Sequence, residues 1–259
     1  MGGTDGSLDG DSRALDDADA DGAPQSGPLQ LMPLGDSITE GSYGTNAGYR
    51  GPLYALLTKT ALSVTFVGSS VQGTVTTTTD PLPMDQWHNE GHASYTIDNI
   101  DNNLDGLDSS TFLMYGGADR NPNGGHWFDG IASGPDARPA LYPDIITLMV
   151  GTNDLGDTDR AAVQTELDDL LTKITTERPN AHLIVAQITP NSSPNVASYN
   201  VAVAAEVTAF AGAGKRVTLV DMNTGFPTDG LSADGIHPND TGYAFMAQQW
   251  FTAIAALML

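Results

Sequence analysis

The chain of 259 residues contains no cysteine, which excludes disulfide bonds and thiolate metal ligands. It also has no run of 18 apolar residues, so no segment is predicted to span a membrane. The N-terminus lacks the basic and apolar regions of a signal peptide within this chain. A cysteine-free chain suits either the cytosol or a secreted protein without disulfides, so these absences do not decide the compartment.

Basic residues are scarce. Ten Lys and Arg residues stand against 32 Asp and Glu residues, which gives a formal net charge of −22. Such a charge repels nucleic acids and anionic lipid surfaces, so neither is expected as a partner. The substrate should therefore be neutral, or small enough to be little affected by the field. Nothing in the composition indicates an oligomeric state.

Residues 1–28 are mostly Asp, Gly, Ala and Ser with few large apolar side chains, and we expect a disordered acidic leader or linker. Asp17 to Gly22 matches the first half of a calcium-binding loop. The twelfth position of that loop should be an acidic ligand, but it is Pro28. We therefore expect neither a metal ion nor another cofactor.

From residue 29 onward, short apolar runs alternate with stretches that have helical spacing of apolar residues. Such alternation predicts an α/β fold with a parallel, doubly wound sheet, in one domain over residues 29–259. The predicted strands are residues 29–34, 63–67, 144–150, 181–188 and 216–220. The predicted helices are residues 49–62, a short one through 100 and 104, 160–176, 196–211 and 240–257.

Three polar blocks follow strands or precede helices: Gly35-Asp36-Ser37, Gly151 to Asp154, and Asp234 to Pro238. In a parallel sheet these loops lie at one edge, where ligands bind. Each block alone has another interpretation. The serine could cap a helix, the asparagine could form a turn, and the Asp-x-x-His spacing could bind a metal. Together, in this order and at one edge, they favour a serine nucleophile with a histidine base.

This order of blocks resembles the SGNH (GDSL-type) hydrolase superfamily over about residues 29–257. The resemblance implies a three-layer, flavodoxin-like fold with a five-stranded parallel sheet and a serine esterase or lipase activity. Residues 89–97, with Gly48-Tyr49-Arg50 before them, resemble acetylxylan esterases of carbohydrate esterase family 3. This closer likeness implies removal of acetyl or other short acyl groups from a small-molecule or polysaccharide ester. It also implies a secreted or extracellular location.

The resemblance assigns roles to individual residues. Ser37 would be the nucleophile, His237 the general base and Asp234 the carboxylate that orients the histidine. The oxyanion hole would use the Ser37 N–H, the Asn153 side chain and one N–H from residues 89–97, here called the second block because they follow the Ser37 block in the chain. The family usually has glycine where this chain has Ser94, so we expect the N–H of Ser94, with Gly91 as the fallback. If that position needs a positive φ, the serine costs on the order of 1 kcal/mol.

A long stretch around residues 109–139 shows no periodicity and includes His126 and Trp127. Exposed aromatic side chains in a Gly-rich loop suit a sugar-binding groove, which makes both residues candidate substrate contacts. Alternatively, Trp127 and Phe128 anchor the loop to the core. A loop of this length is often functional.

Three other functions remain open at this stage. A lipase, arylesterase or thioesterase for longer acyl chains would use the same triad. A dinuclear metal phosphoesterase would need more ligands than five scattered histidines supply. A non-catalytic carbohydrate-binding relative would have no need of the Ser, Asn, Asp and His residues described above.

Overall fold

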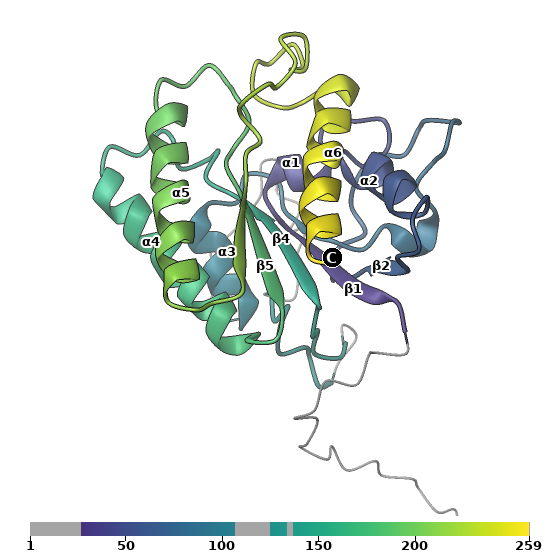
Figure 1. The fold of residues 1–259 in the computed structure, drawn as a ribbon, viewed down its shortest axis with the longest axis horizontal. Helices are drawn as coiled ribbons and strands as arrows, with labels where there is room; N and C mark the ends of the chain where they lie inside the picture. The colour runs from purple at the N-terminus through teal and green to yellow at the C-terminus, as the bar shows by residue number, and fades with distance from the viewer. Residues whose placement is uncertain (1–26, 107–124, 134–136, 259) are drawn as a thin grey trace, which may run out of the picture.

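The computed structural model describes residues 27–106, 125–133 and 137–258. Its centre is a parallel sheet with the strand order β2-β1-β4-β5-β6 (Figure 1). The order confirms the predicted flavodoxin-like arrangement. The chain places β2 on one side of β1 and then adds β4, β5 and β6 in succession on the other side. The five strands are β1 (Leu29–Gly35), β2 (Val64–Phe66), β4 (Ile145–Met149), β5 (His182–Ala186) and β6 (Val217–Val220).

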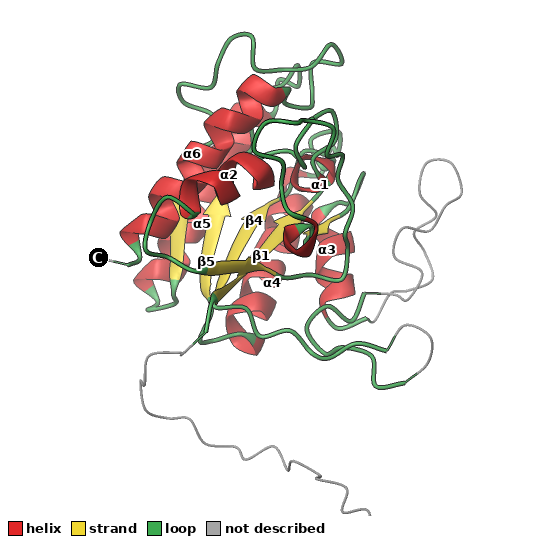
Figure 2. Cartoon of the chain, turned by 90° about the vertical axis from the view of Figure 1, so that its right-hand side faces the viewer, coloured by secondary structure: helices red, strands yellow, loops and turns green. Residues whose placement is uncertain are grey.

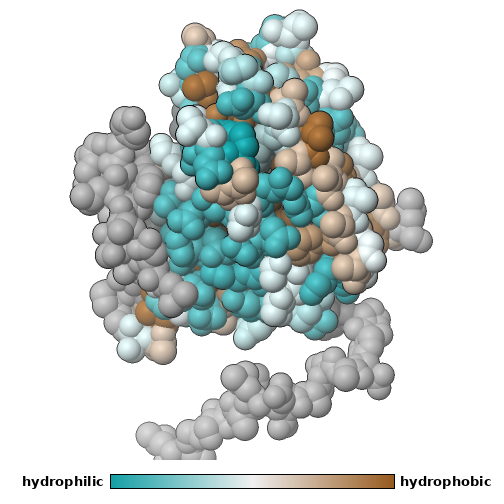
Figure 3. Space-filling model, turned by 90° about the vertical axis from the view of Figure 1, so that its left-hand side faces the viewer, coloured by the Kyte–Doolittle hydropathy of each residue, from teal (hydrophilic) through white to brown (hydrophobic). Residues whose placement is uncertain are grey.

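Helices cover both faces of this sheet and make three layers, as predicted (Figures 1 and 2). α2 (Arg50–Leu57) packs with α6 (Asp240–Ala256) on one face. The other face carries α3 (Ile97–Leu104), α4 (Arg160–Glu177) and α5 (Val196–Gly212). Among the described residues, no helix combines the length and the apolar character needed to cross a membrane. The side of the molecule that carries α4 and α5 is largely hydrophilic (Figure 3).

β1 and β4 position the functional edge. β4 is buried along its whole length, as a strand covered on both faces requires. Its register with β1 pairs Leu31 with Ile145 and Gly35 with Met149. The two strands therefore end side by side, and the loops that follow them leave the sheet at the same edge.

The structure adds three short elements that the sequence pattern did not predict. α1 (Ser37–Glu40) follows β1 directly, η1 (Met84–Gln86) is a short 3-10 helix, and β3 (Glu90–Gly91) pairs with the end of β1. Each has too few residues to show a period.

The helix expected over residues 49–62 is shorter than predicted and ends at Leu57. The hydroxyl groups of Thr58 and Thr60 donate to the carbonyls of Ala55 and Leu57, a local alternative to helix continuation. The predicted leader over residues 1–28 lies outside the described residues except for its last two positions.

Candidate active site

Ser37 is presented by a tight strand-to-helix turn at the carboxyl end of β1. Asp36 caps α1, because its Oδ1 accepts the N–H of Ile38 at 2.9 Å. Gly35 has φ +157°, and a Cβ there would lie 2.2 Å from the carbonyl oxygen of Met149. Only glycine fits at this position, because β4 passes too close for a side chain. The turn therefore depends on Gly35 and on the capping carboxylate.

The side chains of Ser37, His237 and Asp234 form a hydrogen-bonded row of three, the arrangement of a catalytic triad. Ser37 Oγ lies 2.8 Å from His237 Nε2, and His237 Nδ1 lies 2.6 Å from Asp234 Oδ2. Asp234 Oδ1 accepts the N–H groups of Ile236 and His237. Partial burial raises the pKa of Asp234, but these hydrogen bonds outweigh it, so the net pKa lies below the usual aspartate value. An ionised Asp234 favours the tautomer in which His237 Nε2 can accept a proton from serine.

The loop that carries His237 is held from two sides. On one side, the N–H of Ser232 donates to the His237 carbonyl at 2.7 Å, and Asn239 caps α6 through the N–H groups of Thr241 and Gly242. On the other side, the Tyr43 ring stacks on the imidazole with 5.0 Å between ring centres. Tyr43 was not among the predicted site residues, because its only sequence signal is an aromatic residue among glycines just after the nucleophile.

Asn153 lies in the loop after β4, and its side chain contacts the second block. Its Nδ2 donates to the carbonyl of Tyr95 at 2.7 Å. This bond fixes the orientation of the amide and leaves its second N–H for another acceptor, since a primary amide has two. The side chain thus contacts the second block and does more than form a local turn.

The second block contains a turn in which the N–H of Tyr95 donates to the carbonyl of His92. Ser94 sits within this turn with φ +67°, the left-handed conformation that glycine adopts most readily. Within the described part of the chain, the Ser94 N–H has no hydrogen-bond partner. The N–H of Gly91, by contrast, already donates to Asn89 Oδ1 at 2.8 Å. The geometry therefore favours Ser94 over Gly91 as an oxyanion donor.

Buried contacts hold the second block in place. Glu90 is fully buried and accepts hydrogen bonds from the Ser69 hydroxyl at 3.0 Å and from His92 at 2.9 Å. Trp127 is also fully buried and stacks on His92 with 4.6 Å between ring centres and 3° between planes. The expected substrate contact of Trp127 is therefore wrong, because a buried indole has no face left for a sugar ring. It anchors its loop to the core.

His126 is half-buried, and its ring lies against the backbone of Gly106. Its contact with substrate stays a prediction. The rest of the loop around residues 109–139 lies largely outside the described residues.

Two buried carboxyl groups lie near the nucleophile. Burial raises the pKa of Asp36 to about 6, although the Ile38 N–H and the nearby His237 oppose the shift. Burial raises the pKa of Asp154 to about 7, and the charges of Glu166 and Asp36 add to the shift. Asp154 Oδ1 accepts the N–H of Ile97 at 3.2 Å. Asp154 therefore ties the loop after β4 to the start of α3.

A metal site at Asp234 and His237 was the alternative interpretation of their spacing. Over the described ranges, no group of three or more His, Asp and Glu side chains is placed to hold an ion. The pair instead completes the row that ends at Ser37 Oγ.

Comparison with known proteins agrees with this geometry. The model of the GDSL-like Lipase/Acylhydrolase family matches residues 34–245, which is most of the chain. The chain belongs to this family. By family, this GDSL-like chain is a carboxylic ester hydrolase, and the predicted resemblance to SGNH hydrolases is confirmed.

Two carbohydrate esterases share the fold of this GDSL-like chain. A family 3 carbohydrate esterase from Clostridium thermocellum is 30% identical, with a TM-score of 0.65 over 89% of this chain and 98% of that one. A family 3 carbohydrate esterase from Talaromyces cellulolyticus is 25% identical, with a TM-score of 0.65 over 88% and 97%.

A multidomain esterase from Ruminococcus flavefaciens is 27% identical over 240 residues. The alignment covers 88% of this chain but only 28% of that relative. The chain thus spans less than a third of the length of that relative.

Proposed function

We propose that this protein hydrolyses acetyl or other short acyl esters of a carbohydrate. The observation that carries the proposal is the row of Ser37, His237 and Asp234 at the carboxyl edge of the sheet. The likeness to family 3 carbohydrate esterases supports a sugar ester as the substrate. Action on a polysaccharide would place the protein outside the cell, and this location is part of the proposal.

The proposed reaction has two halves. His237 Nε2 takes the proton of Ser37 as Oγ attacks the ester carbonyl, and it then protonates the departing sugar hydroxyl. An acyl-enzyme on Ser37 remains. Water, deprotonated by the same imidazole, releases the carboxylic acid and restores the serine. Asp234 stabilises the imidazolium that forms in each half.

The negative oxygen of each tetrahedral intermediate needs donors that are already in place. The Ser37 N–H and the Ser94 N–H have no partner within the described residues, and Asn153 has its second amide hydrogen. We assign these three groups to the oxyanion hole. Each such donor typically contributes roughly 3–4 kcal/mol to the transition state.

The test is a series of esters hydrolysed by the wild-type protein and by Ser37→Ala. We expect acetate release from acetylated xylan, a maximum at two carbons among p-nitrophenyl esters, and loss of both activities in Ser37→Ala. Covalent labelling of Ser37 by a fluorophosphonate would identify the nucleophile directly.

A maximum at eight carbons or more would show a lipase-type enzyme instead. Full activity in Ser37→Ala would remove the assigned nucleophile. Retention of polysaccharide without turnover would point to a binding module.

A further inference from the structure

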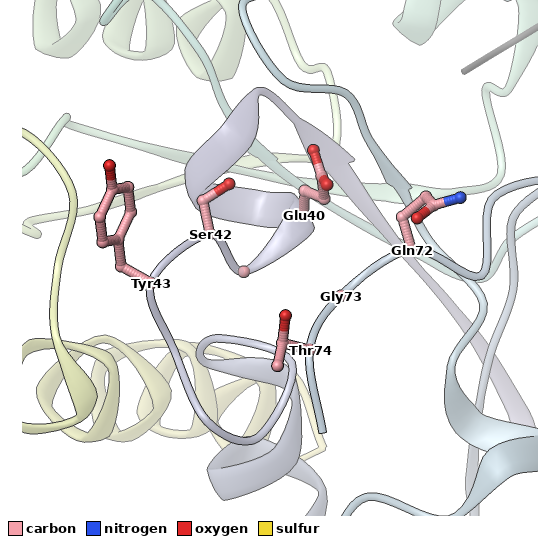
Figure 4. Close-up of a pocket in the computed structure, with 7 residues that line it drawn as sticks. Glu40, Ser42, Tyr43, Gln72, Gly73 and Thr74 are labelled. Atoms are coloured by element: carbon pink, nitrogen blue, oxygen red, sulfur yellow. The ribbon is translucent and has the colours of Figure 1, made fainter. Parts of the chain in front are cut away.

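A pocket of about 410 Å³ lies beside the catalytic residues, within the size range of small-ligand sites. Its walls come from the segment after α1 and from residues 72–74 (Figure 4). Tyr43 stands at one end and Gln72 at the other, with Glu40 and Ser42 between them. The role proposed for it below rests on the esterase function proposed above.

The pocket is joined to the nucleophile through α1. Glu40 lies three residues after Ser37, or roughly 4.5 Å along a helix axis. The N–H of Ser42 donates to the Ser37 carbonyl at 3.0 Å. Tyr43 belongs both to the pocket wall and to the stack on His237. A ligand in the pocket would therefore contact Tyr43, whose ring stacks on the imidazole of His237.

The lining fits a polyhydroxylated ligand better than an acyl chain or an anion. Apart from the Tyr43 ring, its side chains are hydroxyl, amide and carboxylate groups, which exchange hydrogen bonds with sugar hydroxyls. A long acyl chain would offer no hydrogen bond to the hydroxyl groups of Ser42 and Thr74 or to the amide of Gln72. Among the residues that the structure describes, no Lys or Arg lines the pocket to bind an anionic group. The tyrosine ring, 64% exposed, offers an apolar surface to the C–H face of a sugar.

The loop is held so that Tyr43 keeps this place. The Tyr243 hydroxyl donates to the Ser42 carbonyl at 2.7 Å, and the Thr45 N–H and hydroxyl both donate to Asp240 at 2.8 Å. Tyr43 itself has φ +65°, a conformation that costs a non-glycine residue free energy. A strained residue with an exposed aromatic ring, in a loop held by such hydrogen bonds, is typical of a binding position.

We propose that this pocket binds the sugar that carries the ester, with Tyr43 as its stacking surface and Gln72 as a hydrogen-bonding partner. Tyr43 and Gln72 then determine specificity for the alcohol side of the substrate. The acyl group lies beyond them, at Ser37.

The experiment compares kcat/KM for an acetylated xylobiose with kcat/KM for methyl acetate, which has no sugar to bind. The ratio of interest is kcat/KM for the acetylated xylobiose divided by kcat/KM for methyl acetate. Tyr43→Ala and Gln72→Ala should each lower this ratio, by tenfold or more for Tyr43→Ala. Tyr43→Phe should keep most of the wild-type ratio because stacking uses the ring. Tyr142→Ala is the matched control. Its side chain is exposed near Arg178, in the segment before β4 at the other end of the sheet, so both rates should stay at wild-type values.

Each outcome separates the two proposals. Equal losses on both esters in Tyr43→Ala would mean that the ring only supports His237, and they would overturn the sugar pocket. An unchanged ratio in both alanine variants would also overturn it, while the esterase function would stand. If the wild-type protein cleaves methyl acetate but releases no acetate from acetylated sugars, the proposed carbohydrate substrate is wrong and only the esterase activity stands.

Discussion

The Asn153 amide combines an observed structural hydrogen bond with a proposed role in the oxyanion hole. One of its N–H groups is used on the Tyr95 carbonyl, which fixes the amide plane. The other is the N–H that we propose donates to the oxyanion. Ser94, in the same turn as Tyr95, supplies a backbone N–H at φ +67°. The strain at Ser94, on the order of 1 kcal/mol, is the cost of keeping a serine where glycine would be relaxed.

Asn153→Ala should lower kcat by roughly 10²–10³-fold with a small change in KM, because the lost hydrogen bond forms mainly in the transition state. Steady-state kinetics on p-nitrophenyl acetate measure this split. Asn180→Ala is the control, since Asn180 is exposed in the turn before β5. A loss smaller than tenfold in Asn153→Ala would remove this residue from the oxyanion hole.

At the scale of elements, Arg50 links three segments that surround the site. Its guanidinium is fully buried and donates to the carbonyls of Trp87, Glu40 and Gln72 at 2.7, 2.9 and 2.6 Å. Burial lowers the pKa of Arg50 to about 10, so the group stays protonated at neutral pH. It thereby joins the end of α1 to the wall of the proposed sugar pocket.

Arg50→Met should lower the free energy of unfolding by about 3 kcal/mol or more, because one buried and two partly buried carbonyls lose their donor. Urea unfolding followed by circular dichroism measures the change. Arg216→Met replaces an exposed arginine in the same way and should stay within about 0.5 kcal/mol of wild type. Equal stability of the two variants would contradict a structural role for Arg50.

At the scale of the whole molecule, charge sets the pH response. The net charge of −22 leaves a neutral ester unaffected and repels the carboxylate product. Asp36 and Asp154 are buried carboxyl groups whose pKa values are raised to about 6 and about 7. Their protonated forms are favoured in the folded state. Their contribution to stability is therefore present below pH 4 and is lost as the pH rises towards 7.

Asp154→Asn removes one of these groups while keeping an oxygen for the Ile97 N–H. Relative to wild type, the variant should become more stable as the pH rises from 5 to 8, by an amount on the order of a few kcal/mol. Thermal unfolding across this range measures the slope. Asp168→Asn, at an exposed position of α4, should differ from wild type by a constant amount. A flat difference for Asp154→Asn would contradict the raised pKa.

The sequence predicted the elements with long apolar periods well. All five main strands were anticipated, and the helices over residues 160–176, 196–211 and 240–257 match α4, α5 and α6 closely. α1 and β3 were not predicted, because they have four and two residues and therefore no period to detect. It also extended α2 past Leu57, where threonine hydroxyls compete for helix carbonyls.

The sequence by itself determined the fold class and the order of the Ser37, Asn153 and His237 blocks, because periodicity and turn residues are local properties of the chain. Only the tertiary structure decided that the Gly91 N–H is occupied while that of Ser94 is not. It also decided that Trp127 is buried and that Tyr43 lies on His237. These facts depend on contacts between residues far apart in the chain, and a linear pattern does not encode which of its loops will touch.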